Sequence, residues 1–127
     1  MIPDRTTYGV CGVCACLAGG FGYAPSDRRR PIWVCDDPDC LTLARETYTM
    51  RQVEWIEIEL QAIRDAGNHA GEWLDRTGKT DLATLTPDEW EAFCKHMVAS
   101  YRSQLAYHVA AYKARIVENA NAPAPPY

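Results

Sequence analysis

Four of the six cysteines have the spacing of a metal site. Cys11 and Cys14 are separated by two residues, and Cys35 and Cys40 by four. Two close pairs that flank a hairpin-sized loop can turn four thiolates toward one point, which is the tetrahedral arrangement of structural zinc sites. The sequence therefore predicts one Zn²⁺ per chain, bound by Cys11, Cys14, Cys35 and Cys40 and needed for the N-terminal third to fold.

The residues around these cysteines favour the same chemistry. Gly12 suits a tight knuckle within the first pair. Asp37-Pro38 has the cap and first-position proline of a helix, so Cys40 is expected in the first turn, whose positive end favours a thiolate.

Two alternatives stay open for these thiols. Cys16 follows Cys14 by two positions and could replace one of the four ligands, and the long gap in the second pair makes Cys35 and Cys40 the less secure pair. The thiols could also be buried without any metal. Cys94 is expected to pack in the core.

A site of this kind needs a hairpin and a helix to position it. Apolar segments at 21–23 and 32–34 predict two short strands. From Asp37-Pro38 a helix should run toward Ala66, with Gly67-Asn68 as a plausible stop and Gly78 as the end of any continuation. The apolar positions expected to define its buried face are Leu43, Tyr48, Met50, Val53, Ile56, Leu60 and Ile63.

A second long helix begins more clearly, because Thr86-Pro87-Asp88-Glu89 forms a capping box. Its apolar stripe steps by three or four residues, which predicts a helix of about 30 residues. The members of the stripe are Trp90, Phe93, Met97, Tyr101, Leu105, His108, Tyr112 and Ile116.

These elements predict a mainly α fold: an N-terminal zinc finger with a short β-hairpin, followed by a long antiparallel helical hairpin. The expected domains are a finger at residues 1–40, a helical hairpin at 38–118 with a folded connector at 67–85, and an extended Pro-rich tail at 119–127.

The composition is that of an ordinary globular domain, with 127 residues, 47% hydrophobic residues and a formal net charge of −4. The net negative charge argues against a protein that binds nucleic-acid phosphates over its whole surface. Neither a secretory signal nor a membrane-spanning run is evident, so a cytoplasmic location is expected.

The segments Cys11-Gly12-Val13-Cys14, Gly20-Phe21-Gly22-Tyr23 and Ile32-Trp33-Val34-Cys35 resemble a treble-clef or zinc-ribbon-like finger over about 30 residues. Together with Gly78-Lys79-Thr80-Asp81-Leu82 and the segment from Leu85 to Trp90, this finger is similar to an uncharacterised family of small phage and prophage proteins. The resemblance implies a viral or mobile-element origin, hence the host cytoplasm, and it implies no activity.

The chain has no recognisable catalytic constellation. Gly78-Lys79-Thr80 lacks the upstream glycine of a phosphate-binding loop, since position 73 is Trp. His69, His96 and His108 are scattered, and a four-cysteine site leaves no open position for hydrolysis. The sequence therefore predicts a protein that is not an enzyme.

The leading functional hypothesis is a zinc-stabilised protein-binding module. Residues 41–85 hold eight acidic and five basic groups, which suits a basic target such as a host or defence protein that binds nucleic acid and would be inhibited by occupation. Self-association through the long helices is also expected, because two helices cannot cover the whole aromatic stripe.

The alternative hypothesis is nucleic-acid binding. Arg28, Arg29 and Arg30 form a cationic run that could contact the phosphate backbone. The nearby aromatic residues Phe21, Tyr23 and Trp33 could offer stacking faces, or they could shield the zinc below a solvated turn.

Overall fold

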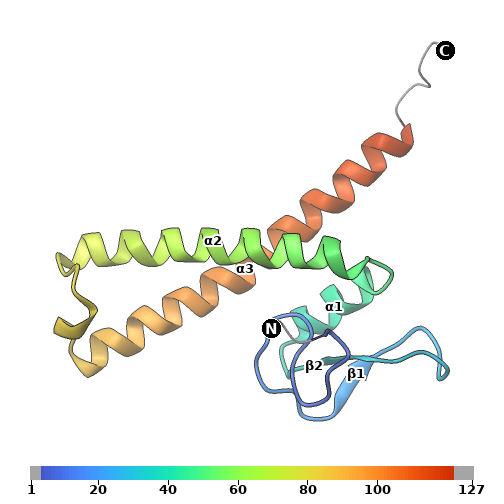
Figure 1. Ribbon diagram of the computed structural model, residues 1–127, viewed down its shortest axis with the longest axis horizontal. Helices are drawn as coiled ribbons and strands as arrows, with labels where there is room; N and C mark the ends of the chain where they lie inside the picture. The colour runs from blue at the N-terminus through green and yellow to red at the C-terminus, as the bar shows by residue number, and fades with distance from the viewer. Residues whose placement is uncertain (1–3, 122–127) are drawn as a thin grey trace. The chain divides into compact units, whose positions relative to one another are not determined.

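The computed structural model describes residues 4–121 and is mainly helical. Along the chain the elements are β1 (Phe21–Tyr23), β2 (Ile32–Val34), α1 (Pro38–Thr47), α2 (Gln52–Thr77), a 3₁₀ turn η1 (Leu82–Thr84) and α3 (Pro87–Asn121) (Figure 1). The chain divides into two compact units, residues 1–60 and 61–127. Within the described part of the chain, no helix combines the length and the apolar character needed to cross a membrane.

The first unit is built on the predicted hairpin and the helix after it. β1 and β2 pair antiparallel over the predicted residues, with Phe21 opposite Val34 and Tyr23 opposite Ile32. Ile32 and Val34 are buried, and α1 contacts both strands. Strands of three residues are too short to be stable alone, so the hairpin depends on what packs against it.

The prediction of one continuous helix from Pro38 to Ala66 is wrong, because α1 ends at Thr47 and α2 begins only at Gln52. The carbonyl of Thr47 accepts the Met50 N–H at 3.0 Å and the side chain of Arg5 at 3.1 Å. In the turn that follows, the Tyr48 hydroxyl donates to the Arg30 carbonyl at 2.7 Å. Contacts with residues distant in sequence therefore end the helix.

The buried face of α2 also differs from the predicted one. Val53, Leu60 and Ile63 are exposed, at 57%, 38% and 50%. Small residues dominate the face that is buried, and this face was missed because the large aliphatic residues gave the stronger pattern. The buried positions of α2 are Trp55, Ile58, Ala62, Ala66 and Ala70.

The second unit consists of the rest of α2 packed against α3. His108 Nε2 lies 2.7 Å from Asp65 Oδ2, and the rings of Trp73 and Phe93 are 6.0 Å apart. Later residues of α2 thus meet earlier residues of α3, which confirms the antiparallel pairing. Leu105 and Val109 are 0% and 1% exposed and form the centre of the buried face of α3.

The predicted stop at Gly67-Asn68 does not occur, and α2 continues to Thr77. A glycine in a helix interior costs about 1 kcal/mol, which the burial of the flanking Ala66 and Ala70 can offset. Gly78 ends the helix as predicted: its φ is +73° and the Lys79 N–H donates to the Leu74 carbonyl at 3.3 Å. The connector is therefore residues 78–86 rather than 67–85.

The capping box that begins α3 is confirmed. The Glu89 N–H donates to Thr86 Oγ1 at 3.2 Å, and the Thr86 N–H donates to Glu89 Oε1 at 2.9 Å. At the other end α3 reaches Asn121, so residues 119–121, predicted as part of the extended tail, are helical. The remainder of the predicted tail, residues 122–127, lies outside the described residues.

Candidate metal centre

The first two cysteines sit on a tight knuckle near the start of the chain. The Cys14 N–H points to Cys11 Sγ at 3.5 Å, and the Cys11 carbonyl accepts the Ala15 N–H at 2.9 Å. Ala15 closes the knuckle in the left-handed region, with a φ of +67°. The Cys11 N–H then donates to the Cys16 carbonyl at 2.7 Å, so the backbone of the knuckle is fixed on both sides.

Gly12 lets this knuckle lie against the rest of the unit. Its N–H donates to the Trp33 carbonyl of β2 at 2.7 Å. A Cβ at this position would be 2.5 Å from the Arg5 carbonyl oxygen and 2.7 Å from Cγ2 of Ile32. Only glycine fits there, because the Arg5 and Ile32 atoms lie too close to leave room for a side chain. The backbone conformation of Gly12 does not itself require glycine.

The second pair of cysteines comes from the end of β2 and the first turn of α1. Cys35 directly follows the strand, and Cys40 lies three residues after the helix cap Asp37. Asp37 accepts the Asp39 N–H on its side chain at 2.9 Å and the Cys40 N–H on its carbonyl at 3.0 Å. These bonds set the start of α1 and the place of the last thiol.

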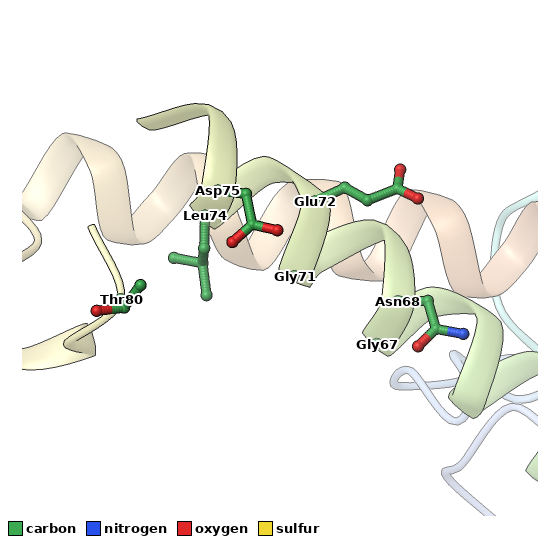
Figure 2. Close-up of a pocket in the computed structure, with 7 residues that line it drawn as sticks. All are labelled: Gly67, Asn68, Gly71, Glu72, Leu74, Asp75 and Thr80. Atoms are coloured by element: carbon green, nitrogen blue, oxygen red, sulfur yellow. The ribbon is translucent and has the colours of Figure 1, made fainter. Parts of the chain in front are cut away.

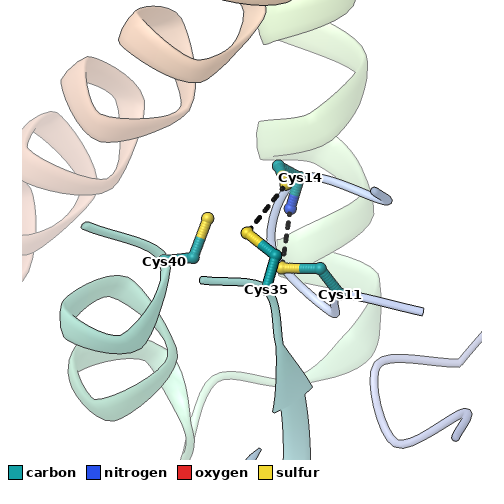
Figure 3. Close-up of side chains that lie close together, drawn as sticks. All are labelled: Cys11, Cys14, Cys35 and Cys40. Atoms are coloured by element: carbon teal, nitrogen blue, oxygen red, sulfur yellow. Dashed lines mark hydrogen bonds between the residues drawn. The ribbon is translucent and has the colours of Figure 1, made fainter. Parts of the chain in front are cut away.

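The four sulfurs of Cys11, Cys14, Cys35 and Cys40 all lie within 4.8 Å of one another, converging from three elements (Figure 3). The sulfurs of Cys14 and Cys35 are 3.7 Å apart. A tetrahedral zinc with Zn–S bonds of about 2.3 Å requires sulfurs about 3.8 Å apart, so the cluster fits such an ion. Four soft thiol ligands without a carboxylate also favour zinc over magnesium or calcium.

Burial and hydrogen bonding make this cluster unlike four ordinary thiols. Cys11, Cys14 and Cys40 are buried, and Cys35 is half-buried. Hydrogen bonds from the Cys14 and Cys40 side chains hold the pKa of Cys11 far below its usual range. The same bond to Cys11 raises the pKa of Cys14 to about 12, and the pKa of Cys40 is raised in the same way. A metal ion bound by the cluster would displace the protons of its thiols, so metal affinity should depend on pH.

The structure also places the cysteines that the prediction left open. Among the described residues, the cluster consists of the four named cysteines and does not include Cys16. Cys16 instead contributes its backbone carbonyl to the knuckle. Cys94 lies in α3, in the second unit, where it is half-buried.

Comparison with known proteins gives a family for the helical part of the chain. Residues 52–125 match the model of a family of unknown function, DUF6511. The chain belongs to this family. The match contains α2 and α3 and begins after the last of the four clustered cysteines. No curated protein and no protein of solved structure matches the chain.

The arginines considered for nucleic-acid binding in this DUF6511 protein are exposed. Arg28, Arg29 and Arg30 lie in the loop between β1 and β2. Of the three neighbouring aromatic residues Phe21 is 59% exposed, whereas Tyr23 and Trp33 are half-buried. The ring of Tyr8 packs edge-on against Trp33 at 4.9 Å, so part of the predicted stacking surface is already covered.

The histidines of the DUF6511 region are not part of a metal group among the described residues. His108 is hydrogen-bonded to Asp65 across the two helices. His69 and His96 lie with ring centroids 6.4 Å apart, and His69 Nδ1 is 3.9 Å from a Glu72 oxygen.

An open hollow of about 540 Å³ lies over the end of α2 in the second unit (Figure 2). Gly67 and Gly71 leave the helix surface bare, while Glu72 and Asp75 make its rim acidic and Thr80 comes from the connector. Its lining contains neither a histidine nor a cysteine, so it offers no soft metal ligand.

The residues that contact the cysteine cluster from outside it were not predicted from the sequence pattern. Arg5 is only 6% exposed, and its side chain reaches both the knuckle and the end of α1. Its partner Thr47 is 42 positions away, so no local pattern could reveal the contact. The available signal was a single arginine just before a segment rich in glycine and cysteine.

Proposed function

We propose that this DUF6511 protein is a non-enzymatic, zinc-stabilised binding module in which Cys11, Cys14, Cys35 and Cys40 hold one Zn²⁺. The observation that carries the proposal is the convergence of four sulfurs within 4.8 Å. A bound zinc would fix the knuckle, β2 and α1 to one another. Because four thiolates fill the tetrahedral positions of zinc, the site would have no place for a substrate, which supports a structural role.

Metal analysis of ligand variants tests this role. Protein purified without added metal should contain zinc near one equivalent per chain. Cys11→Ser and Cys40→Ser should lose it, whereas Cys94→Ser, a cysteine of the second unit, should keep it. A wild-type chain that stays metal-free in the presence of micromolar zinc would contradict the site, and loss of zinc only in Cys16→Ser would show a different ligand set.

Binding is proposed to occur through the helical region. Tyr107 and Val117 of α3 are 65% and 59% exposed, and the described part of α3 has no buried residue after Val109. Exposed apolar side chains on a helix support a contact with another protein. The acidic excess of residues 41–85 supports a basic target, and the resemblance to phage and prophage proteins supports a host or defence protein as that target, with inhibition as the outcome.

Capture of partners from a host lysate tests this part of the proposal, with paired variants as controls. Tyr107→Ser with Val117→Ser should abolish capture while leaving zinc content unchanged. Replacing Arg28, Arg29 and Arg30 by alanine should leave capture intact. Salt-dependent binding to DNA or RNA that is lost in the triple arginine variant would instead favour the nucleic-acid alternative.

Self-association through α3 is part of the same proposal. Within the second unit, α3 from Pro87–Asn121 is about twice as long as the part of α2 from residue 61 to Thr77. Light scattering at micromolar concentration should show a mass above 14.3 kDa that returns to 14.3 kDa in the variant combining Tyr107→Ser and Val117→Ser. A wild-type sample that contains only a 14.3 kDa species would contradict self-association.

A further inference from the structure

Arg5 is a buried cation beside the cysteine cluster. It is 6% exposed, and its guanidinium lies 3.9 Å from the ring centroid of Trp55, which is itself 1% exposed. Burial lowers the pKa of Arg5 to about 10, which leaves the side chain charged at neutral pH. Burying a charged side chain costs free energy unless the charge is paired and hydrogen-bonded.

The hydrogen bonds of Arg5 join the knuckle to the end of α1. Its Nε donates to the Gly12 carbonyl at 3.1 Å, inside the first cysteine pair. Its Nη1 and Nη2 donate to the carbonyl and hydroxyl oxygens of Thr47 at 3.1 and 2.6 Å. A planar fork with several fixed donors can make these three bonds together, whereas an ammonium group cannot span the same acceptors.

Arg5 is also close to the Cys11 thiol. Arg5, Cys11 and Glu59 line the same small cavity of about 40 Å³, and both the Glu59 carboxylate and Cys11 interact electrostatically with the Arg5 charge. A zinc ion with four thiolates has a net charge of 2−, because the ion contributes two positive charges and the sulfurs four negative ones. A buried cation close to such a centre lowers its electrostatic free energy more than an exposed one.

We infer that Arg5 is a positioning residue of the four-cysteine site: it fixes the Gly12 carbonyl between the first two cysteines of the chain and places a buried positive charge on the Cys11 side of the cluster. This inference rests on the proposed zinc site. It differs from a simple packing role, because both the fork and the charge act on the affinity for metal, and the two contributions can be separated by substitution.

Competition for zinc with a chromogenic chelator, on the full chain, tests the inference. Arg5→Met removes both charge and fork and should raise the zinc Kd about 10- to 100-fold, as loss of a residue that orients metal ligands typically does. Arg5→Lys keeps the charge and should recover part of that loss. Thr47→Val removes one acceptor of the fork and should raise the Kd several-fold. Arg29→Met, an exposed arginine of the same unit, is the matched control and should leave the Kd unchanged.

Cobalt-substituted protein provides the second measurement. Arg5→Met should keep the absorption of a tetrahedral four-thiolate cobalt centre at saturating metal, which would show that all four ligands remain and that only the affinity has changed. A Kd within about twofold of wild type in Arg5→Met and Thr47→Val would overturn the inference. Equal losses in Arg5→Lys and Arg5→Met would overturn the role of the charge. Should Arg5→Met not fold, Thr47→Val and Arg5→Lys decide the question. A wild-type chain without zinc would refute the site itself, and that result is distinct from these.

Discussion

The two units of this protein are stabilised in different ways. In residues 4–60 the strands have three residues each, and an apolar core that includes Ile32, Val34 and Trp55 adjoins a cluster of thiols and a buried arginine. In residues 61–121 two helices bury alanine, phenylalanine, leucine and valine. The first unit therefore adds a few strong polar interactions to its apolar packing, whereas the described part of the second depends mainly on apolar packing.

Metal removal should produce the largest difference in stability between the two units. Zinc binding to four thiolates contributes on the order of 10 kcal/mol in small domains, so a chelator should unfold the first unit and leave the second folded. Amide hydrogen exchange should lose its protection at residues 10–40 and keep it around Leu105 and Val109. Simultaneous loss of protection in both regions would show that the second unit also requires the metal.

Truncation of Leu105 should destabilise the second unit and leave the first unit folded. This side chain is fully buried in the second unit, and Leu105→Ala should destabilise that unit by about 2–5 kcal/mol, through lost burial and the cavity it leaves. Urea unfolding followed by circular dichroism measures the loss, and zinc content should remain at one equivalent. Ser103→Ala, at an exposed position of the same helix, is the control and should change stability by less than about 0.5 kcal/mol. Loss of zinc in Leu105→Ala would mean that the first unit depends on this packing.

The capping box of α3 offers a smaller change within the second unit. Thr86→Ala removes the hydroxyl that accepts the Glu89 N–H and should cost about 1 kcal/mol. Thermal unfolding measures the loss, with Thr80→Ala in the connector as the control. An equal cost at both positions would argue against the cap as the cause.

Glu89 should make this cap sensitive to acid. The hydrogen bond from Lys79, aided by the Thr86 N–H, lowers the pKa of Glu89 from 4.5 to about 2. Because the folded pKa is the lower one, the stabilisation is complete above about pH 4.5 and is lost as pH falls through about 2. The difference in melting temperature between wild type and Glu89→Gln should therefore shrink over this interval. A difference that stays constant would contradict the assigned role.

Ala15 should give the smallest effect, and in the first unit. Its left-handed conformation costs about 1–2 kcal/mol, and glycine would remove that strain while losing about 0.5–1 kcal/mol in chain entropy. Ala15→Gly should thus stabilise the zinc-loaded protein by about 0.5 kcal/mol, as measured by urea unfolding. Ala18→Gly, where no positive φ is present, should destabilise it by a similar amount. Destabilisation by both substitutions would contradict the prediction that Ala15→Gly relieves backbone strain.

The parts that could be predicted from sequence are those encoded by neighbouring residues. The Asp37 cap and the Thr86 capping box depend on contacts within three positions, and both lie where the pattern placed them. The hairpin strands pair residues farther apart, such as Phe21 with Val34, but their apolar segments also lie where they were predicted. The spacing of the cysteines likewise identified the four thiols that converge. These features need little knowledge of the rest of the fold.

The errors arose where distant residues decide the outcome. The end of α1 at Thr47 depends on Arg5, and the continuation of α2 through Gly67 depends on the burial of Ala66 and Ala70. Single-residue preferences of about 1 kcal/mol are easily outweighed by such packing. The exposed Val53 and Ile63 show the same limit, because hydrophobicity alone does not tell which face meets a partner.

The order of the four cysteines along the chain has a consequence for biosynthesis. The last of them, Cys40, is translated well before α3, so all four clustered thiols are made while the helices that follow are still being translated. At roughly 5–20 residues per second, translation of residues 41–121 takes roughly 4–16 s. During that interval the nascent cluster could bind the proposed Zn²⁺, and Arg5 can contact Thr47 and Trp55 only once α1 and the start of α2 have been translated. Metal supply would therefore act on this protein during translation, before its helical unit exists.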